Sequence, residues 1–124
     1  MNSLNSILLE GNVVEDPVIH TTPRGTQVCT FIIASNRNYK QENEIIQEVS
    51  CFEIETWASL AKACFSSCSK GRGVRVVGRL KQEHGIGDDG TAFSKVKVIG
   101  EHIEFKPNFR HDVEDEETED AAFD

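Results

Sequence analysis

No run of apolar residues in this 124-residue chain approaches the ~20 residues that a membrane-spanning helix requires. The first four residues, Met1-Asn2-Ser3-Leu4, also lack the basic segment that opens a secretory signal. These absences argue against a helical membrane protein and against export. We therefore expect a cytoplasmic protein with no membrane partner.

The sequence also lacks the groupings of residues that catalysis requires. The serine-rich segment 66–69 has no nucleophile-elbow context, and the segment 71–73, Gly-Arg-Gly, is shorter than a phosphate loop and typical of a turn. Glu53 and Glu55 share one face of a predicted strand, but no phosphate loop or set of metal ligands accompanies them. We therefore predict that the protein is not an enzyme and has no cofactor.

Four cysteines admit two interpretations, a metal site or buried thiols. Cys64 and Cys68 are one helical turn apart and could offer two ligands on one face, but a structural zinc site needs four. No other Cys or His pair completes the set, since Cys29 and Cys51 lie in separate strand-like segments. Free cysteine is among the most often buried residues, so we expect no metal and four buried, inert thiols.

Charge divides the chain into two parts. Residues 1–106 carry 12 Lys or Arg and 13 Asp or Glu, whereas residues 107–124 carry one Arg and eight acids. An acidic block of this kind is usually disordered and often binds partners, although a tail that only keeps the protein soluble has the same composition. We expect one folded domain over residues 1–106 and a disordered acidic tail over residues 107–124.

The alternation of apolar and polar residues predicts an all-β domain with one short helix. The helix, at 57–68, separates the third predicted strand from the fourth. This order is that of an OB-fold, a five-stranded Greek-key barrel that often binds oligonucleotides. Segment 37–46 is expected to be a polar loop or an extended hairpin, and segment 84–92 a hairpin turn. The predicted strands are 5–14 (continued by 18–22), 27–36, 50–57, 74–81 and 94–105.

The outward residues of these strands form a candidate binding face, on which cations alternate with aromatic rings. Val74, Val76, Leu80, Val96 and Val98 are expected to point inward. Lys and Arg can follow phosphates while bases stack on rings, at about 1–3 kcal/mol per base and with little sequence preference. A merely solvated face, with Trp57 covering the start of the helix, would show the same pattern. The outward residues are Arg37, Tyr39, Lys40, Cys51, Glu53, Glu55, Trp57, Arg75, Val77, Arg79, Lys81, Phe93, Lys95 and Lys97.

Several blocks, in this order and spacing, resemble the bacterial single-stranded DNA-binding protein family. Segment 5–13 with Asp16-Pro17 matches a Val-x-Leu-x-Gly-x-Leu…Asp-Pro run, and Ala34-Ser35-Asn36 follows. Segment 57–61, Trp-Ala-Ser-Leu-Ala, is close to the family's Trp-Gly-Lys-Leu-Ala. Segments 70–71 and 74–80 are close to its Lys-Gly…Val-x-Val-x-Gly-x-Leu. The resemblance covers residues 3–106.

The resemblance implies a homotetrameric OB-fold that wraps single-stranded DNA in replication, recombination and repair, associated with the nucleoid. It places Tyr39, Trp57 and Phe93 at or near base-stacking positions. It also implies an acidic tip that recruits DNA-metabolism proteins, here Asp120 and Phe123. Family cations that bind the DNA backbone fall near Arg37, Lys40, Lys70, Arg72, Lys81, Lys95 and Lys97, and the outward pattern adds Arg75 and Arg79.

The chain departs from the family pattern on the predicted face and at its end. Cys51 stands at a position that is typically aromatic, another aromatic position is His84 or Gly85, and Glu53 and Glu55 add negative charge. The last residue is Asp124 rather than the family's terminal Phe. These departures leave a second hypothesis open, namely an OB-fold that assembles proteins and whose nucleic-acid surface has decayed.

Overall fold

The computed structural model describes residues 1–107. The predicted tail and its tip residues, Asp120 and Phe123, therefore lie outside the described residues, apart from Pro107. No helix in the described part is long and apolar enough to cross a membrane. The elements, in chain order, are β1 (Ile7–Val13), β2 (Val18–Thr21), β3 (Gln27–Gln41), β4 (Glu44–Trp57), α1 (Ala58–Ser67), β5 (Gly73–Ile86) and β6 (Ala92–Phe105).

The strands form one sheet that closes on itself. Its order is β1-β5-β6-β4-β3-β2, and an additional pairing of β1 with β3 completes the barrel. All pairs are antiparallel except β4 with β6, which run parallel where Ile54 lies opposite Val98. The first predicted strand is two strands, β1 and β2, that follow one another around the barrel. With these two counted together, the predicted five-stranded OB-fold with a helix before the fourth strand is confirmed.

Alternate residues of the strands and one side of α1 fill the barrel. Ile33, Ile54, Val74 and Val76 are completely buried, as are Ala61 and Cys64 of α1 and its C-cap residue Cys68. These side chains pack together in one cluster. Helix α1 contributes only a short apolar stripe, so the burial of that stripe against β3 and β4 rather than helix propensity stabilises it.

Three of the four thiols are buried as expected, and one is not. Cys29, Cys64 and Cys68 are inaccessible in the core cluster, and burial raises the pKa of the Cys29 thiol to about 11. The expectation for Cys51 is wrong, because it faces solvent on β4. Among residues 1–107, no group of three or more His, Cys, Asp or Glu side chains could hold a metal ion.

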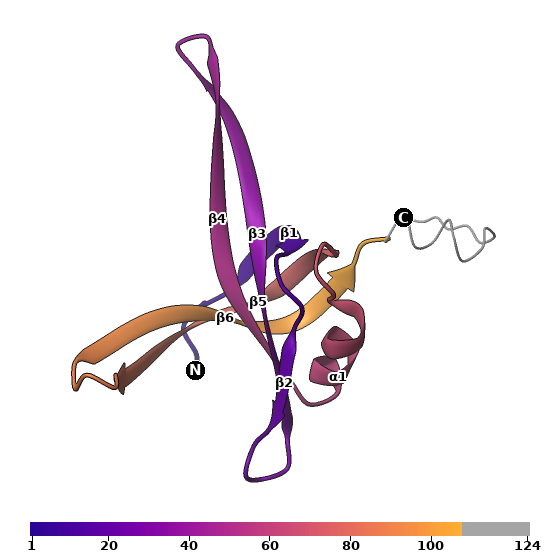
Figure 1. The fold of residues 1–124 in the computed structure, drawn as a ribbon, viewed down its shortest axis with the longest axis vertical. Coiled ribbons are helices and arrows are strands. Elements are labelled where there is room, and N and C mark those ends of the chain that lie inside the picture. The colour runs from indigo at the N-terminus through magenta and orange to yellow at the C-terminus, as the bar shows by residue number, and fades with distance from the viewer. Residues whose placement is uncertain (108–124) are drawn as a thin grey trace, which may run out of the picture.

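Two long hairpins project from the barrel in different directions (Figure 1). The β3–β4 arm comprises residues 36–49, and the β5–β6 arm comprises residues 82–96. Of the two structures predicted for segment 37–46, the extended hairpin is the one formed, with a turn at Glu42 and Asn43. The turn predicted at 84–92 is shorter than expected, because the strands stay paired as far as Ile86 and Ala92.

The junction between β4 and α1 contains one residue in an unfavourable conformation. Ala58, the first residue of α1, has a φ of 60°, in the left-handed region that costs an L-residue about 1–2 kcal/mol. Glycine adopts this region without that cost. We therefore expect Ala58→Gly to raise the free energy of unfolding by about 1 kcal/mol in urea denaturation.

A matched substitution controls for the flexibility that glycine adds to the unfolded chain. Ala92 is also exposed and also begins an element, but it is not among the described residues with positive φ. Ala92→Gly should lower the free energy of unfolding. Equal effects of the two substitutions would contradict the conformational explanation.

Candidate nucleic-acid interface

One side of β4, β5 and β6 carries half of the predicted stacking and phosphate-binding residues, and we call it the Trp57 side. The pairing of Lys81 with Lys97 across β5 and β6, and of Glu55 with Ile99 across β4 and β6, fixes which residues share it. The alternation in the sequence therefore predicts correctly which residues of β4, β5 and β6 share one face of the sheet. Its members are Cys51, Glu53, Glu55, Trp57, Arg79, Lys81, Glu83, Phe93, Lys95, Lys97 and Ile99.

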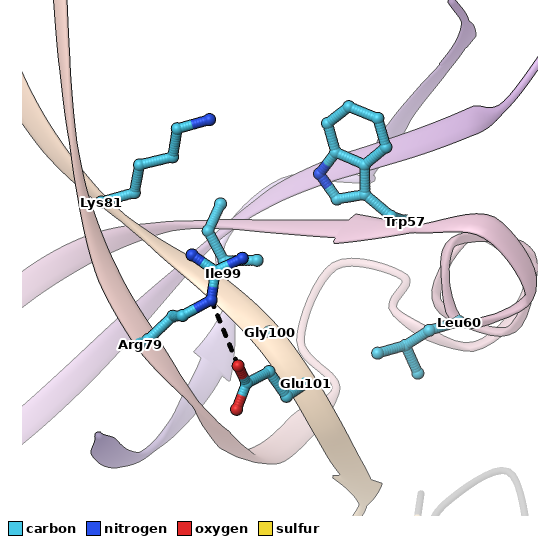
Figure 2. Close-up of a pocket in the computed structure, with 7 residues that line it drawn as sticks. All are labelled: Trp57, Leu60, Arg79, Lys81, Ile99, Gly100 and Glu101. Atoms are coloured by element: carbon cyan, nitrogen blue, oxygen red, sulfur yellow. Dashed lines mark hydrogen bonds and ion pairs between the residues drawn. The ribbon is translucent and has the colours of Figure 1, made fainter. Parts of the chain in front are cut away.

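A pocket of about 450 Å³ opens on the Trp57 side. Figure 2 shows Trp57 and Leu60 on one side of it, with Arg79 and Lys81 on the other. Ile99 lies between them and is only 6% exposed, so the floor is apolar. Ligand sites of this size usually combine apolar walls with a few polar groups. Here the ring and the apolar floor lie beside two cations and the carboxylate of Glu101.

Trp57 is exposed at the rim of this pocket, and its indole N–H has a partner within the protein. It is the N-cap residue of α1 and makes no side-chain cap hydrogen bond. Its indole Nε1 instead donates to Oε2 of Glu55 at 2.6 Å, and 43% of the residue stays exposed. The alternative interpretation, in which Trp57 merely covers the start of the helix, therefore leaves its exposed surface unexplained.

The structure reverses the expected burial of two neighbours on β6. Val96 was expected to point inward, but it is 59% exposed because it lies on the β5–β6 arm beyond the barrel. Lys97 was expected to point outward into solvent, but it is 7% exposed. Leu80, also expected inward, is 43% exposed at the rim of the barrel. Strand alternation predicts the side of each residue but not how far neighbouring strands extend over it.

Lys97 is surrounded by carboxylates instead of solvent. Its Nζ donates to Glu55 Oε1 at 2.5 Å and to Glu83 Oε2 at 3.1 Å. Burial opposes the charged form of Lys97, but the hydrogen bonds that it donates to Glu55 and Glu83 outweigh this effect and raise the pKa of Lys97. The hydrogen bond and charge of Lys97 in turn lower the pKa of Glu83. Lys97 as a phosphate contact stays a prediction, and this burial counts against it.

Phe93 and Lys95 continue the Trp57 side along the β5–β6 arm. Phe93 is 45% exposed and lies opposite Gly85, where any side chain would collide with the Phe93 ring. Lys95 forms ion pairs with Glu53 at 3.4 Å and Glu83 at 3.8 Å, at the solvent surface. The ring of Phe93 is therefore available for stacking, while the charge of Lys95 is partly neutralised.

Tyr39, Arg37 and Lys40 lie on the other arm, where the pairing separates them. Tyr39 lies opposite Ile46 on the same side of β3 as the core residue Ile33, whereas Lys40 is on the opposite side. The Arg37 guanidinium stacks on the Tyr39 ring, 4.7 Å from its centroid, and also pairs with Glu48. One face of the ring is thus already covered by a cation.

The remaining predicted cations fall into two groups. Arg75 pairs with Glu10 and Glu104, and Arg79 pairs with Glu101 at the edge of the pocket. The second group consists of cations that form no ion pair within residues 1–107. One of them, Arg72, donates a hydrogen bond to the Lys106 carbonyl. Members of this second group have no carboxylate partner in the part of the chain that the structure describes. They are Lys40, Lys70, Arg72 and Lys81.

Sequence reasoning missed Glu83, Leu60 and Ile99 as parts of this site. Glu83 joins Lys95 to Lys97, while Leu60 forms an apolar wall and Ile99 the apolar floor of the pocket. The position of the β5–β6 turn would have placed Glu83 opposite Lys95. The pocket walls depend on the packing of α1 beside the parallel pair of strands, for which the sequence holds no local signal.

Comparison with known proteins adds three findings. Residues 4–106 match the model of the single-strand binding protein family. A single-stranded DNA-binding protein of Aquifex aeolicus is 40% identical over 101 residues, covering 81% of this chain and 68% of the relative. Single-stranded DNA-binding protein 2 of Chlorobaculum tepidum is 33% identical over 119 residues, covering 94% and 80%.

A solved structure is similar in fold. The structure titled Plasmodium falciparum SSB complex with ssDNA aligns with a TM-score of 0.78 and 25% sequence identity. The alignment covers 86% of this chain and 98% of that one. The barrel and its arms therefore have a close structural counterpart in a protein whose structure contains single-stranded DNA.

Proposed function

Because the chain belongs to the single-strand binding protein family, we propose that it binds single-stranded DNA with little sequence preference. The observation that carries this proposal is the pocket between Trp57 and Lys81. There a half-exposed indole ring faces a lysine that has no ion-pair partner within residues 1–107. Surfaces that bind single-stranded nucleic acid combine these two kinds of group, a ring on which a base stacks and a cation near the phosphate.

The mechanism combines stacking with neutralisation of phosphates. Bases stack on Trp57 and Phe93, and on the uncovered face of Tyr39 along the β3–β4 arm. Phosphates lie near the cations that keep their charge, above all Lys40 and Lys81, with Lys70 and Arg72 contributing if the strand extends around the barrel. Every base has a face that can stack, so the surface discriminates little between sequences.

In the cell, this activity protects unpaired DNA during replication, recombination and repair. The relatives are named as single-stranded DNA-binding proteins, which supports the binding step of this role. In this proposal the protein acts by binding rather than by catalysis. We further propose a homotetramer near the nucleoid in the cytoplasm. The acidic tail, with Asp120 and Phe123, would recruit other proteins of DNA metabolism, and this part of the proposal concerns residues beyond the described ones.

Titration with labelled dT oligomers of increasing length tests the proposal. We expect micromolar or tighter binding at moderate salt, with quenching of Trp57 fluorescence. The logarithm of the binding constant should fall with the logarithm of salt concentration at a slope of about −0.7 per phosphate contacted. Because Arg75, Arg79, Lys95 and Lys97 are already paired with carboxylates, the slope should correspond to the unpaired cations.

The same titration distinguishes the second hypothesis, a protein-assembly module. Glu53, Glu55 and Glu83 on the Trp57 side motivate it, since they repel phosphates. Absence of binding to dT oligomers at low salt would overturn DNA binding and favour the assembly module. An affinity that does not depend on salt would contradict the phosphate contacts.

A further inference from the structure

We propose that Glu55 and Lys97 are positioning residues that hold the Trp57 ring in the orientation that stacks on a base. The inference rests on the proposed DNA-binding function, but it assigns to two charged residues of the binding side a role other than contact with DNA. It also accounts for the presence of a carboxylate where phosphate is expected to bind.

The two carboxylate oxygens of Glu55 serve two different donors. Oε2 accepts from the Trp57 indole Nε1 at 2.6 Å, and Oε1 accepts from Lys97 Nζ at 2.5 Å. The side chains of Glu55 and Lys97 are only 9% and 8% exposed. A carboxylate with both oxygens occupied in a buried setting has one orientation, and this orientation fixes the direction of the indole N–H.

Lys97 is itself held from a third strand. Its Nζ donates to Glu83 on β5 at 3.1 Å, and Glu83 also pairs with Lys95. The contacts therefore run from Trp57 and Glu55 on β4 through Lys97 on β6 to Glu83 on β5. An exposed tryptophan would otherwise lose its rotational freedom on binding, and prior fixation removes that cost.

A purely electrostatic view of the same residues predicts the opposite effect of mutation. On that view, Glu55 repels DNA and occupies Lys97, so its neutralisation should strengthen binding. In our proposal, its neutralisation weakens binding because the ring loses its anchor. The sign of the change in affinity therefore separates the two views without any assumption about its size.

Two substitutions of Glu55 test the proposal, measured with fluorescein-labelled dT at fixed salt. Glu55→Gln replaces one of the two acceptor oxygens by an NH2 donor, so either Trp57 or Lys97 loses the oxygen to which it donates. Glu55→Asp keeps the charge but shortens the side chain, which moves the carboxylate away from the indole. We expect each to weaken binding by about fivefold, because a ring that is no longer fixed must give up its rotational freedom when it binds. Glu55→Asp remains informative if Glu55→Gln does not fold.

The matched control is Glu53, two residues earlier on the same side of β4. It pairs with Lys95 and makes no hydrogen bond to Trp57. Glu53→Gln should leave binding unchanged or strengthen it, and Glu53→Asp should leave it unchanged. If Glu55→Gln strengthens binding as Glu53→Gln does, or if Glu55→Asp has no effect, the positioning role is wrong.

A second readout does not involve DNA. Trp57 is the only tryptophan of the chain, so time-resolved anisotropy of its emission reports the motion of this ring alone. We expect the fast component of the anisotropy decay to be larger in both Glu55 variants than in the wild-type protein. In the Glu53 variants it should be unchanged. Failure of the wild-type protein to bind dT would overturn the proposed function, whereas unchanged ring motion would overturn the positioning role by itself.

Discussion

Replacement of Gly78 by alanine is expected to lower the free energy of unfolding by about 3 kcal/mol, at the upper end of the effects of overpacking. A Cβ atom at this position would lie 2.1 Å from the carbonyl oxygen of Ile99 and 3.0 Å from its carbon. Both are backbone atoms of the paired strand, so no side-chain rotation relieves the collision. Gly78 also adjoins the register shift between β5 and β6, where Gly78 lies opposite Gly100.

Urea denaturation followed by circular dichroism measures this change, and Gly87→Ala is the control. At Gly87, the nearest atoms to a new Cβ are a side-chain oxygen of Asp89 at 3.2 Å and the Thr91 carbonyl oxygen at 3.7 Å. Because the Asp89 side chain can move, we expect a change within about 0.5 kcal/mol. Similar stabilities of the two variants would show that the strands separate at the register shift at little cost.

Replacement of Trp57 by alanine is expected to weaken binding to dT oligomers by roughly fivefold to 150-fold, which corresponds to about 1–3 kcal/mol for one stacked base. The substitution removes the ring at the rim of the pocket and leaves Lys81 and Arg79 in place. The slope of affinity against salt should therefore stay unchanged while the affinity falls. Fluorescence anisotropy of labelled dT at several salt concentrations measures both.

Phe65→Ala provides the control for the loss of an exposed ring. Phe65 lies on α1 outside the predicted binding surface and is 49% exposed, close to the 43% of Trp57. Its removal should leave the affinity for dT unchanged. Equal affinities of the Trp57→Ala variant and the wild-type protein would mean that the ring at this position does not stack on DNA.

The barrel could be predicted from the sequence because its signals are local. The alternation in segments 27–36 and 74–81 and the helical spacing between them identify strands and helix without knowledge of their neighbours. The lengths of the arms could not be predicted in this way. Residues 36–49 lie beyond the barrel with few buried side chains, so the sequence carries no apolar alternation there, and the pairing itself defines these strands.

For the binding surface, the sequence predicts the face of the sheet on which each residue lies, but not the burial or the partners of its side chain. Alternation placed Trp57, Lys81 and Lys97 on one side of the sheet, as the pairing also does. The burial of Lys97 depends on Glu55, which is 42 residues earlier, and on Glu83 across the arm. Such a contact arises from the parallel pairing of β4 with β6, and no pattern within either strand indicates it.

The single solvent-facing thiol on β4 makes the natural chain ready for site-selective dye conjugation. Cys51 is exposed on the Trp57 side, while the other three cysteines are enclosed in the core. A maleimide reagent at neutral pH should therefore attach one fluorophore per chain without any engineered residue. Energy transfer from the indole to that fluorophore would then report changes in the distance between two positions on the Trp57 side.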